Sequence, residues 1–287
     1  MANPILRQKV ENGTFFAAPG LQDMISATIA KDVGFDVVYG TGYWLTASAY
    51  GLPDAGIATY SQMVDRMATL VRTCGGAAVI ADADTGYGGL LNVHHTVRGY
   101  EAAGVSAVQI EDQEFPKKCG HTPYKRCLPT QDMIRKIEVA LAARTDPDLL
   151  IIARSDARAG EGFEAMLRRC EAYAAAGADL IFPEALLTQE EMRQACASIP
   201  KPCIANMADG GVTPILPAQT LQEIGYACAI YPAMCGLAAA AAVRHALTRF
   251  KTTGTSVMPD VPLHDFQHFC RLIGFEEVWA FEERWAS

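Results

Sequence analysis

Residues 163–184 read FEAMLRRCEAYAAAGADLIFPE and hold one complete helix, turn and strand. Apolar side chains recur at helical spacing from Phe163 to Ala176, and the Ala-Gly-Ala-Asp sequence at the helix end is typical of a stop before a strand. The strand Leu180–Pro183 is a continuous apolar run, as expected when both faces of a strand are buried. This stretch therefore predicts one helix–strand unit of a parallel sheet.

The same unit recurs along the chain, where short apolar strands alternate with longer amphipathic helices. The predicted strands are Phe15–Ala18, Asp36–Thr41, Ala78–Asp82, Ala107–Glu111, Leu149–Arg154, Leu180–Pro183, Cys203–Asn206 and Ala227–Tyr231, and predicted helices include Asn92–Ala103, Gln131–Ala143, Phe163–Ala176 and Pro232–Phe250. Eight such units predict an α/β fold, a (β/α)8 TIM barrel over residues 1–251. A doubly wound sheet is the alternative, which the lack of Gly-x-Gly-x-x-Gly after the first strand disfavours.

Residues 252–287 are predicted to form a C-terminal helical arm. A linker containing Gly, Thr and Pro, residues 252–262, precedes two short helices expected at Leu263–Leu272 and Glu276–Trp285. Aromatic side chains recur along this arm at Phe266, Phe269, Phe275, Trp279, Phe281 and Trp285. We expect so apolar an arm to dock on another surface, and a neighbouring subunit is one candidate.

Composition limits the classes of function. The net charge of −8 argues against a nucleic-acid-binding protein, and no apolar stretch approaches the roughly 20 residues of a membrane span. The Ala-rich run 237–243 is too short to cross a membrane and predicts a tightly packed helix. The nine cysteines are an odd number without framework spacing, and the N-terminus lacks the apolar core of a signal peptide. We therefore expect reduced cysteines and a cytoplasmic protein.

Polar groups follow the predicted strands at the end where barrel active sites lie. Asp82 and Asp84 alternate by two, so both carboxylates are expected on one face of a strand end, where they repel unless a cation lies between them. Hard oxygen ligands suggest Mg²⁺, with Mn²⁺ as the alternative, and Glu111 on the next strand could complete the outer shell. The competing interpretation is that both aspartates only cap the following helix.

Three further strand ends carry groups suited to a substrate. Arg154 fits a planar, bidentate grip on a carboxylate, although an ion pair with Glu184 or Asp156 is an open alternative. Glu184 and Asn206 follow the next two strands and could contact either substrate or a loop. The predicted ligand is thus a small anionic molecule.

The loop after the fourth strand holds Lys117-Lys118-Cys119-Gly120-His121. Two neighbouring lysines favour a reactive thiol at Cys119, Gly120 allows close approach of the backbone to a ligand, and His121 titrates near neutral pH. Such a loop suits an enzyme that moves a proton to or from carbon. A structural zinc site with Cys127 is disfavoured because a fourth ligand is missing.

The set Thr41-Gly42, Gly51-Leu-Pro-Asp54, Asp82-Ala-Asp84-x-Gly-Tyr-Gly, Ile110-Glu-Asp-Gln113, Lys117-Lys-Cys-Gly-His121 and Ala153-Arg154-x-Asp156 resembles the isocitrate lyase/phosphoenolpyruvate mutase superfamily. The Cys-Gly-His motif points to its carbon–carbon lyase branch, which includes 2-methylisocitrate lyase, dimethylmalate lyase and the petal-death protein. The mutase and phosphonopyruvate hydrolase branch lacks this motif. The resemblance implies a barrel whose eighth helix is swapped between subunits, a homotetramer, Mg²⁺ and a mobile loop carrying the cysteine.

The resemblance also implies roles for particular residues. Those implied at the metal are Asp82 and Asp84, with Asp54 and Glu111 supporting it partly through water, and those implied at the substrate are Thr41, Gly42, Tyr43, Gly120, Arg154, Glu184 and Asn206. The Cys119 thiol is expected to protonate the carbon of an enediolate, tuned by His121 and Lys118. Tyr39, Glu184 and a water on the metal are the open candidates for the base.

Two departures from the family pattern concern the substrate. Methylisocitrate lyases carry Ser-Gly-Gly where this chain has Thr41-Gly42-Tyr43, and an arginine that grips a third carboxylate where this chain has Leu237. An unpaired carboxylate in a closed site is costly, so a dicarboxylate with an alkyl group is favoured over a tricarboxylate.

The expected activity is cleavage of 2,3-dimethylmalate or another 2-alkylmalate, with 2-methylisocitrate as the tricarboxylate alternative, into a 2-oxo acid such as pyruvate and a carboxylic acid. Two other functions stay open. One is hydrolysis or decarboxylation of oxaloacetate or an alkylated oxaloacetate on the same scaffold, and the other is binding of a dicarboxylate without catalysis.

Overall fold

The computed structural model describes residues 1–120, 122 and 124–286, and within them eight strands form one sheet. The strands are β1 (Phe16–Leu21), β2 (Val37–Gly40), β3 (Ala78–Asp82), β4 (Ala107–Glu111), β5 (Leu150–Ser155), β6 (Leu180–Pro183), β7 (Ile204–Asn206) and β8 (Cys228–Tyr231). Every predicted strand is present, and β3, β4 and β6 have the predicted bounds.

The helices alternate with these strands. They are α1 (Ile5–Glu11), α2 (Met24–Val33), α3 (Gly42–Tyr50), α4 (Tyr60–Cys74), α5 (Leu90–Ala103), α6 (Thr130–Ala143), α7 (Arg158–Glu161), α8 (Phe163–Ala175), α9 (Gln189–Ser198), α10 (Ala218–Ile224), α11 (Met234–Thr253), α12 (Phe266–Leu272) and α13 (Phe275–Trp285). The predicted helix that starts at Phe163 ends one residue early, and the one expected from Pro232 starts at Met234 and runs to Thr253.

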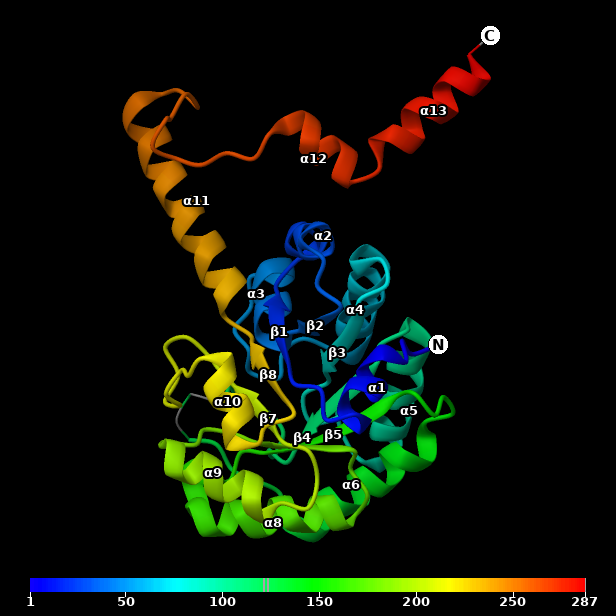
Figure 1. Cartoon of the computed structure of the whole chain (residues 1–287), viewed down its shortest axis with the longest axis vertical. Coiled ribbons are helices and arrows are strands. Elements are labelled where there is room, and N and C mark those ends of the chain that lie inside the picture. Colours follow the sequence, from blue (N-terminus) through cyan, green and yellow to red (C-terminus); the bar gives the residue numbers. More distant parts are fainter. Residues whose placement is uncertain (121, 123, 287) are drawn as a thin grey trace.

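All neighbouring strands pair in parallel, in the order β6-β5-β4-β3-β2-β1-β8-β7. A parallel bridge between Ile181 and Cys203 brings β6 beside β7, so the sheet nearly closes into a barrel with helices around it (Figure 1). The predicted (β/α)8 barrel is confirmed, and the doubly wound alternative is wrong because its open sheet would leave β6 and β7 apart.

Most strands bury both of their faces, and Ala17 of β1 is an exposed exception. In β3, Ala78 and Ile80 join the apolar cluster inside the barrel, whereas Val79 and Ala81 join the larger cluster between the sheet and the helices. Leu6 of α1 belongs to the inner cluster and is only 1% exposed. This double burial explains why the strands are continuous apolar runs and not alternating ones.

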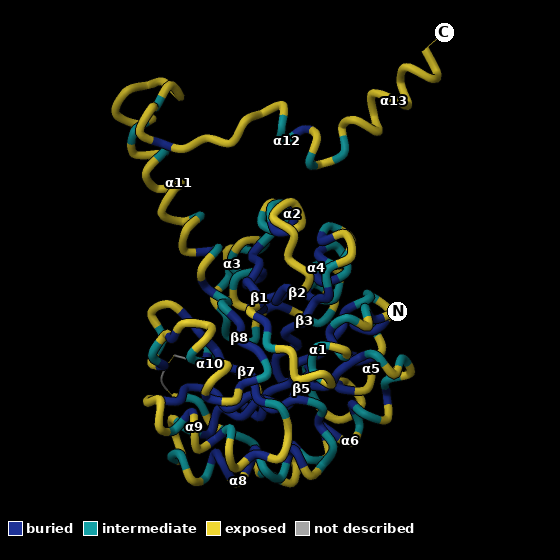
Figure 2. Tube along the Cα trace, viewed as in Figure 1, coloured by how far each residue is buried: buried dark blue, intermediate teal, exposed yellow. Residues whose placement is uncertain are grey.

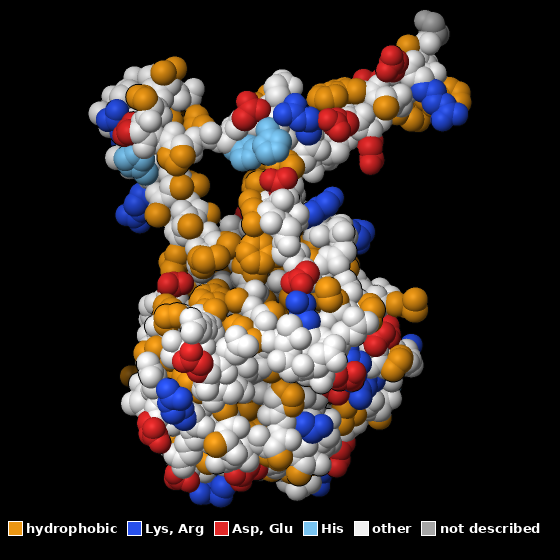
Figure 3. All heavy atoms as spheres, viewed as in Figure 1, with side chains coloured by type: hydrophobic (Ala, Val, Ile, Leu, Met, Phe, Trp, Pro, Cys, Tyr) orange, Lys and Arg blue, Asp and Glu red, His pale blue; other side chains and the backbone are white. Residues whose placement is uncertain are grey.

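The last three helices extend from the barrel, which α11 contacts at β1 and α12 at α2. Helix α11 projects from the end of β8, α12 crosses above α2, and α13 points outward, largely exposed along its length (Figures 1 and 2). Gly236 is the buried residue of α11, and its Leu247 and Phe250 are more than half exposed. Apolar side chains gather around the base of α11 and along α12 and α13 (Figure 3). The Ala-rich run expected to pack tightly thus has little contact within its own chain.

The division into a catalytic domain, residues 1–251, and an arm, residues 252–287, stays a prediction, and α11 continues across the expected boundary. In the described part of the chain, no helix has the length and apolarity needed to cross a membrane.

Candidate active site

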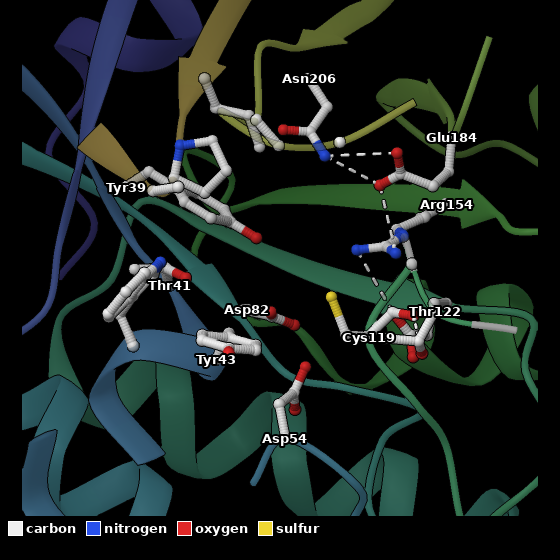
Figure 4. Close-up of a pocket in the computed structure, with 18 of the residues that line it drawn as sticks. Tyr39, Thr41, Tyr43, Asp54, Asp82, Cys119, Thr122, Arg154, Glu184 and Asn206 are labelled. Atoms are coloured by element: carbon white, nitrogen blue, oxygen red, sulfur yellow. Dashed lines mark hydrogen bonds and ion pairs between the residues drawn. The ribbon is translucent and has the colours of Figure 1, made fainter. Parts of the chain in front are cut away.

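A cavity of about 360 Å³ opens at the carboxyl ends of the strands (Figure 4). Most of the predicted site residues line it, namely Thr41, Tyr43, Asp54, Asp82, Glu111, Lys118, Cys119, Gly120, Arg154, Glu184 and Asn206. Gly42 and Asp84 do not line the cavity, but their backbone N–H groups donate to Asp82 Oδ2 at 3.3 Å and to Asp82 Oδ1 at 3.0 Å. The structure therefore brings the predicted residues together. His121 lies outside the described residues.

Asp82 is held by the backbone on both sides. It ends β3, and the chain then leaves strand geometry, because Asp84 has a left-handed φ of 49°. The sequence prediction assumed that the strand pleat sets the direction of the Asp84 side chain. This assumption is wrong, because the chain has left strand geometry at Asp84. A Cβ on Gly42 would lie 2.8 Å from Asp82 Oδ2, so only glycine lets the start of α3 approach this carboxylate.

Lys117 connects two acidic loops. Its Nζ contacts Asp84 Oδ1 at 2.6 Å and also pairs with Asp54 Oδ1, and its side chain is 3% exposed. Burial alone would lower the pKa of Lys117, but Asp84, Glu111 and Asp54 raise it well above the ordinary value. The ammonium group therefore stays charged and fixes Asp54 beside the β3 loop.

Arg154 lies at the centre of a buried polar chain. Its Nε and Nη2 donate to Asp156 Oδ2 and Oδ1 at 2.9 and 3.0 Å, and its Nη2 and Nη1 lie 3.2 Å from Glu184 Oε2 and 3.5 Å from Glu111 Oε2. Asn206 Nδ2 donates to Glu184 Oε2 at 3.0 Å. The ion pairs weighed as an alternative role for Arg154 are present, and the guanidinium still lines the cavity.

The loop that carries Cys119 is tied at several points. Gln113 exchanges two hydrogen bonds with the backbone of Lys118, both 2.9 Å long, and Lys118 Nζ donates to the carbonyl of Tyr124 at 3.3 Å. Lys125 Nζ donates to the Gly120 carbonyl and lies 3.2 Å from Asp156 Oδ1. The Cys119 thiol points towards the centre of the cavity, between Asp82 and Arg154 (Figure 4). Lys117 and Lys118 of the predicted motif, although adjacent, therefore contact different partners.

The Tyr39 hydroxyl also lies in the cavity and donates to Gln109 Oε1 at 3.2 Å. Burial, and then the nearby Asp82 carboxylate, raise the pKa of Tyr39 well above its ordinary value. A phenol in this environment stays protonated. Of the predicted base candidates, Tyr39 is therefore suited to donate a hydrogen bond rather than to accept a proton.

The carboxyl groups fit a divalent cation of the Mg²⁺ type. Burial raises the pKa of Asp84 to about 6 and that of Glu111 well above its ordinary value, so these are groups that a cation would ionise. Glu111 Oε1 is buried and has no hydrogen-bond partner among the described residues. Within the described residues, no three His, Cys, Asp or Glu side chains are grouped closely enough to hold a metal ion by themselves.

Part of the cavity lining is apolar. It is formed by the side chains of Tyr43, Trp44, Ile230, Pro232, Ala233 and Leu237. The Tyr43 and Trp44 rings meet edge to face with centroids 5.1 Å apart, and Gly236 of α11 approaches Trp44 so closely that a Cβ would overlap the indole. The site thus pairs a charged side with a wall suited to alkyl groups.

Sequence reasoning missed two contributors to this site. Trp44 follows Tyr43 in α3, and its place in the wall depends on the contact with α11, which no local pattern indicates. Lys125 lies in a stretch without regular structure, and nothing in its spacing from Cys119 indicates a buried ammonium group.

Comparison with known proteins gives consistent results. The family described as phosphoenolpyruvate phosphomutase matches residues 6–251. A 2,3-dimethylmalate lyase of Eubacterium barkeri is 39% identical over 282 residues, which are 98% of this chain and 97% of that protein. A 2-methylisocitrate lyase of Bacillus subtilis is 43% identical over 249 residues, which are 87% of this chain and 80% of that protein.

Solved structures resemble the whole chain. A crystal structure of 2,3-dimethylmalate lyase superposes with a TM-score of 0.93 at 33% identity, covering 100% of this chain and 96% of that one. Oxaloacetate acetylhydrolase with the inhibitor 3,3-difluorooxalacetate gives 0.91 at 30% identity, covering 97% and 95%. Phosphonopyruvate hydrolase in complex with oxalate and Mg²⁺ gives 0.88 at 32% identity, covering 100% of both chains.

Proposed function

Since this chain belongs to the phosphoenolpyruvate mutase/isocitrate lyase superfamily and is 39% and 43% identical to two lyases, we propose that it is a magnesium-dependent carbon–carbon lyase. The proposed substrate is a 2-hydroxy dicarboxylate of the 2,3-dimethylmalate or 2-alkylmalate type. Cleavage gives a 2-oxo acid such as pyruvate and a second carboxylic acid. One observation carries the proposal: the Cys119 thiol faces the same cavity as the Asp82 carboxylate and the Arg154 guanidinium.

The charged side of the cavity supplies the groups that bind the substrate. Arg154 presents its guanidinium to one substrate carboxylate, while Asp156 holds its other edge. Thr41, Gly42 and Tyr43 at the start of α3, together with the Gly120 backbone and Asn206, are the remaining proposed contacts. This arrangement orients the bond to be cleaved below the thiol.

Asp82 and Asp84 would hold Mg²⁺, or Mn²⁺ in its place, with Asp54 and Glu111 supporting the ion. When bound, the ion would lower the pKa of the substrate 2-hydroxyl and offset the charge of the substrate carboxylate. Lys117 keeps Asp54 and Asp84 in place on this side of the cavity.

Two protons must move during the cleavage. The 2-hydroxyl loses one as the carbon–carbon bond breaks, and Glu184, which is buried beside Arg154 and Asn206, is our proposed acceptor. The Cys119 thiol gives a proton to the carbanionic carbon of the departing enediolate, and His121 and Lys118 are proposed to tune the thiol. Asn206 and the backbone near Gly120 would stabilise the charge of that enediolate.

The apolar wall favours an alkyl-bearing dicarboxylate. A third carboxylate next to Leu237, Pro232 and Trp44 would lose its hydration without gaining a charged partner, which is costly in a closed site. We therefore favour dialkylmalates over 2-methylisocitrate, although a 2-methylisocitrate lyase is among the similar proteins.

A second candidate is hydrolysis or decarboxylation of oxaloacetate or an alkylated oxaloacetate. The similarity to oxaloacetate acetylhydrolase, at a TM-score of 0.91, supports it. Both candidates would use the same metal and the same binding groups, so the products distinguish them.

We also propose a homotetramer in the cytoplasm in which α11 packs on a second subunit. The exposed apolar side chains of α11, among them Val243, Leu247 and Phe250, support this arrangement, since on one chain they lie open to solvent.

The test is an assay of 2-oxo acid release coupled to lactate dehydrogenase and NADH, with Mg²⁺ present. The substrates are 2,3-dimethylmalate, citramalate, 2-methylisocitrate and isocitrate, and oxaloacetate is followed by loss of its own absorbance. Preference for a dialkylmalate or citramalate supports the lyase. Activity on oxaloacetate alone supports the second candidate, and tight binding of oxalate with no turnover of any of these substrates would refute the proposed activity.

The Cys119→Ser variant tests the proton donor. We expect turnover to fall by about 10²–10⁴-fold, the usual contribution of a positioned general acid, while the dissociation constant for oxalate changes little. Calorimetric titration with oxalate in Mg²⁺ provides the binding control. Turnover close to that of the unmodified protein would refute the role of Cys119.

A further inference from the structure

Lys125 has a buried ammonium group that the proposed reaction does not use. Its side chain is 3% exposed, and its Nζ donates to the Gly120 carbonyl and lies 3.2 Å from Asp156 Oδ1. Burying a cation is costly unless its partners compensate for the lost hydration. Both of its partners belong to the active site, since Gly120 follows the cysteine and Asp156 holds the arginine.

Asp156 is a rigid point of the barrel. It is 1% exposed, accepts two hydrogen bonds from Arg154, and its N–H donates to Asp112 Oδ1 at 2.9 Å. Asp112 is itself held by the hydroxyls of Ser155 and Tyr173, each at 2.8 Å. Burial alone would raise the pKa of Asp156, but Arg154 and Lys125 together hold it below the ordinary value. Asp156 is thus an anion shared by two cations.

Gly120 is a point of close approach between the loop and the barrel. A Cβ on Gly120 would overlap Arg154 Nη2 and lie 3.1 Å from the Glu184 side chain. The Gly120 carbonyl belongs to the residue that directly follows Cys119, so a bond to it restrains the backbone next to the thiol. A bond to this carbonyl acts directly on the thiol that is proposed to donate a proton.

The lysines of the loop make different contacts. Lys117 joins the loop to Asp54 and Asp84, and Lys118 bonds to the Tyr124 carbonyl within the loop. Among the contacts described, Lys125 joins the segment bearing the cysteine to the side of the cavity that holds Arg154.

We propose that Lys125 is a positioning residue that latches the Cys119–Gly120 segment to Asp156, so that the thiol and the substrate-binding Arg154 are held in one geometry. This inference rests on the proposed function, because it assigns the latch to the proton-donating thiol. The predicted consequence is that loss of the ammonium group releases the thiol from the cavity without unfolding the barrel.

The test compares Lys125→Met with Lys125→Arg, and Arg126→Met is the matched control. Arg126 is the neighbouring cation; its side chain is 82% exposed and its ion pair is with Glu114. The first readout is the alkylation rate of Cys119 by iodoacetamide, followed by mass spectrometry of the tryptic peptide that begins at residue 119. The pH dependence of the rate is measured from about pH 7 to 9, where the lysine keeps its proton, and the rate constant of the thiolate obtained from it is compared among the variants with Mg²⁺ and with or without oxalate.

We expect Lys125→Met to alkylate at least tenfold faster than the unmodified protein under both conditions, Lys125→Arg to recover most of the difference, and Arg126→Met to behave as the unmodified protein. The coupled assay should show kcat falling by about 10²-fold in Lys125→Met with a smaller change in KM, and circular dichroism should show an intact fold. Alkylation rates within twofold of each other would overturn the latch, whatever the enzyme turns over. If no substrate is turned over, the proposed function fails while the alkylation rates still decide whether Lys125 holds the thiol.

Discussion

Adding a single methyl group at Gly120 tests how closely the loop must approach the barrel. In Gly120→Ala the new Cβ overlaps Arg154 Nη2, and Glu184 Cγ and Cδ lie 3.1 Å away. Arg154 cannot move aside cheaply, since Asp156 binds its Nε at 2.9 Å and its Nη2 at 3.0 Å. Either the guanidinium leaves Asp156 or the loop lifts away.

The cost of displacing the Arg154 guanidinium from Asp156 sets an upper limit on the free-energy penalty of the methyl group. Breaking a buried ion pair by displacing one partner costs about 3–5 kcal/mol, and lifting the loop removes the thiol and the Gly120 carbonyl from their places instead. At about 1.4 kcal/mol per factor of ten, kcat/KM should therefore fall by roughly 10²-fold to at most 4 × 10³-fold. The melting temperature should change little, because the loop can move into solvent without opening the core.

The assay is the coupled measurement of 2-oxo acid release, with the dissociation constant for oxalate measured alongside. Gly160→Ala is the control, since its Cβ would meet only the Lys125 carbonyl oxygen at 3.9 Å. This control should stay within about twofold of the unmodified protein, because a contact at that distance is an ordinary van der Waals contact. A Gly120→Ala protein with kcat/KM within threefold of normal would refute the close approach described above.

Three further predictions follow from the site and the arm. Because burial raises the pKa of Asp84 to about 6 even beside Lys117, protons should compete with the metal below that pH. The Mn²⁺ dissociation constant, measured by electron paramagnetic resonance, should therefore rise by up to about tenfold per pH unit from pH 6 to 5 and stay nearly constant above pH 7. Replacing Leu237 by arginine should raise the kcat/KM ratio of 2-methylisocitrate to 2,3-dimethylmalate by about 10–100-fold in the coupled assay, because the third carboxylate gains a partner; an unchanged ratio would show that Leu237 does not face that carboxylate. Light scattering should give the mass of a tetramer, and Leu247→Asp in α11 should lower it; a monomer in the unmodified protein contradicts the proposed packing.

Much of the barrel could be predicted because a buried strand has few alternatives. The runs Ala78–Asp82, Ala107–Glu111 and Leu180–Pro183 are apolar throughout and end at a charged or turn-forming residue, so their bounds are fixed locally. The first strand was expected to end at Ala18, before Pro19 and Gly20, but it runs to Leu21. Pairing of Pro19 with Tyr231 and the tight contact of Gly20 with the Pro232 backbone extend it, and neither is visible in local sequence.

The site, too, has features that the local sequence determines and features that depend on tertiary contacts. The residues at the strand ends could be predicted because a parallel barrel gathers the carboxyl ends of its strands, and Asp82, Glu111, Arg154 and Asn206 do lie around one cavity. The partners of the loop lysines could not be predicted. Lys117 and Lys118 are adjacent in sequence, yet one ammonium lies between two aspartates and the other at a backbone carbonyl, because tertiary contacts decide where a loop side chain points.

The polar chain across the barrel mouth also constrains how the strands align. Glu111 lies opposite Arg154 in the register of β4 and β5, and Arg154 reaches Glu184 at the end of β6. A slip of two residues between neighbouring strands would keep every apolar side chain on its proper face, so burial of apolar surface alone distinguishes it poorly from the native alignment. The slipped barrel would, however, leave Arg154 and its carboxylates buried without their partners, at a cost of several kcal/mol. The charges proposed to bind the substrate would thus also favour the native strand alignment, because they destabilise a barrel with misaligned strands.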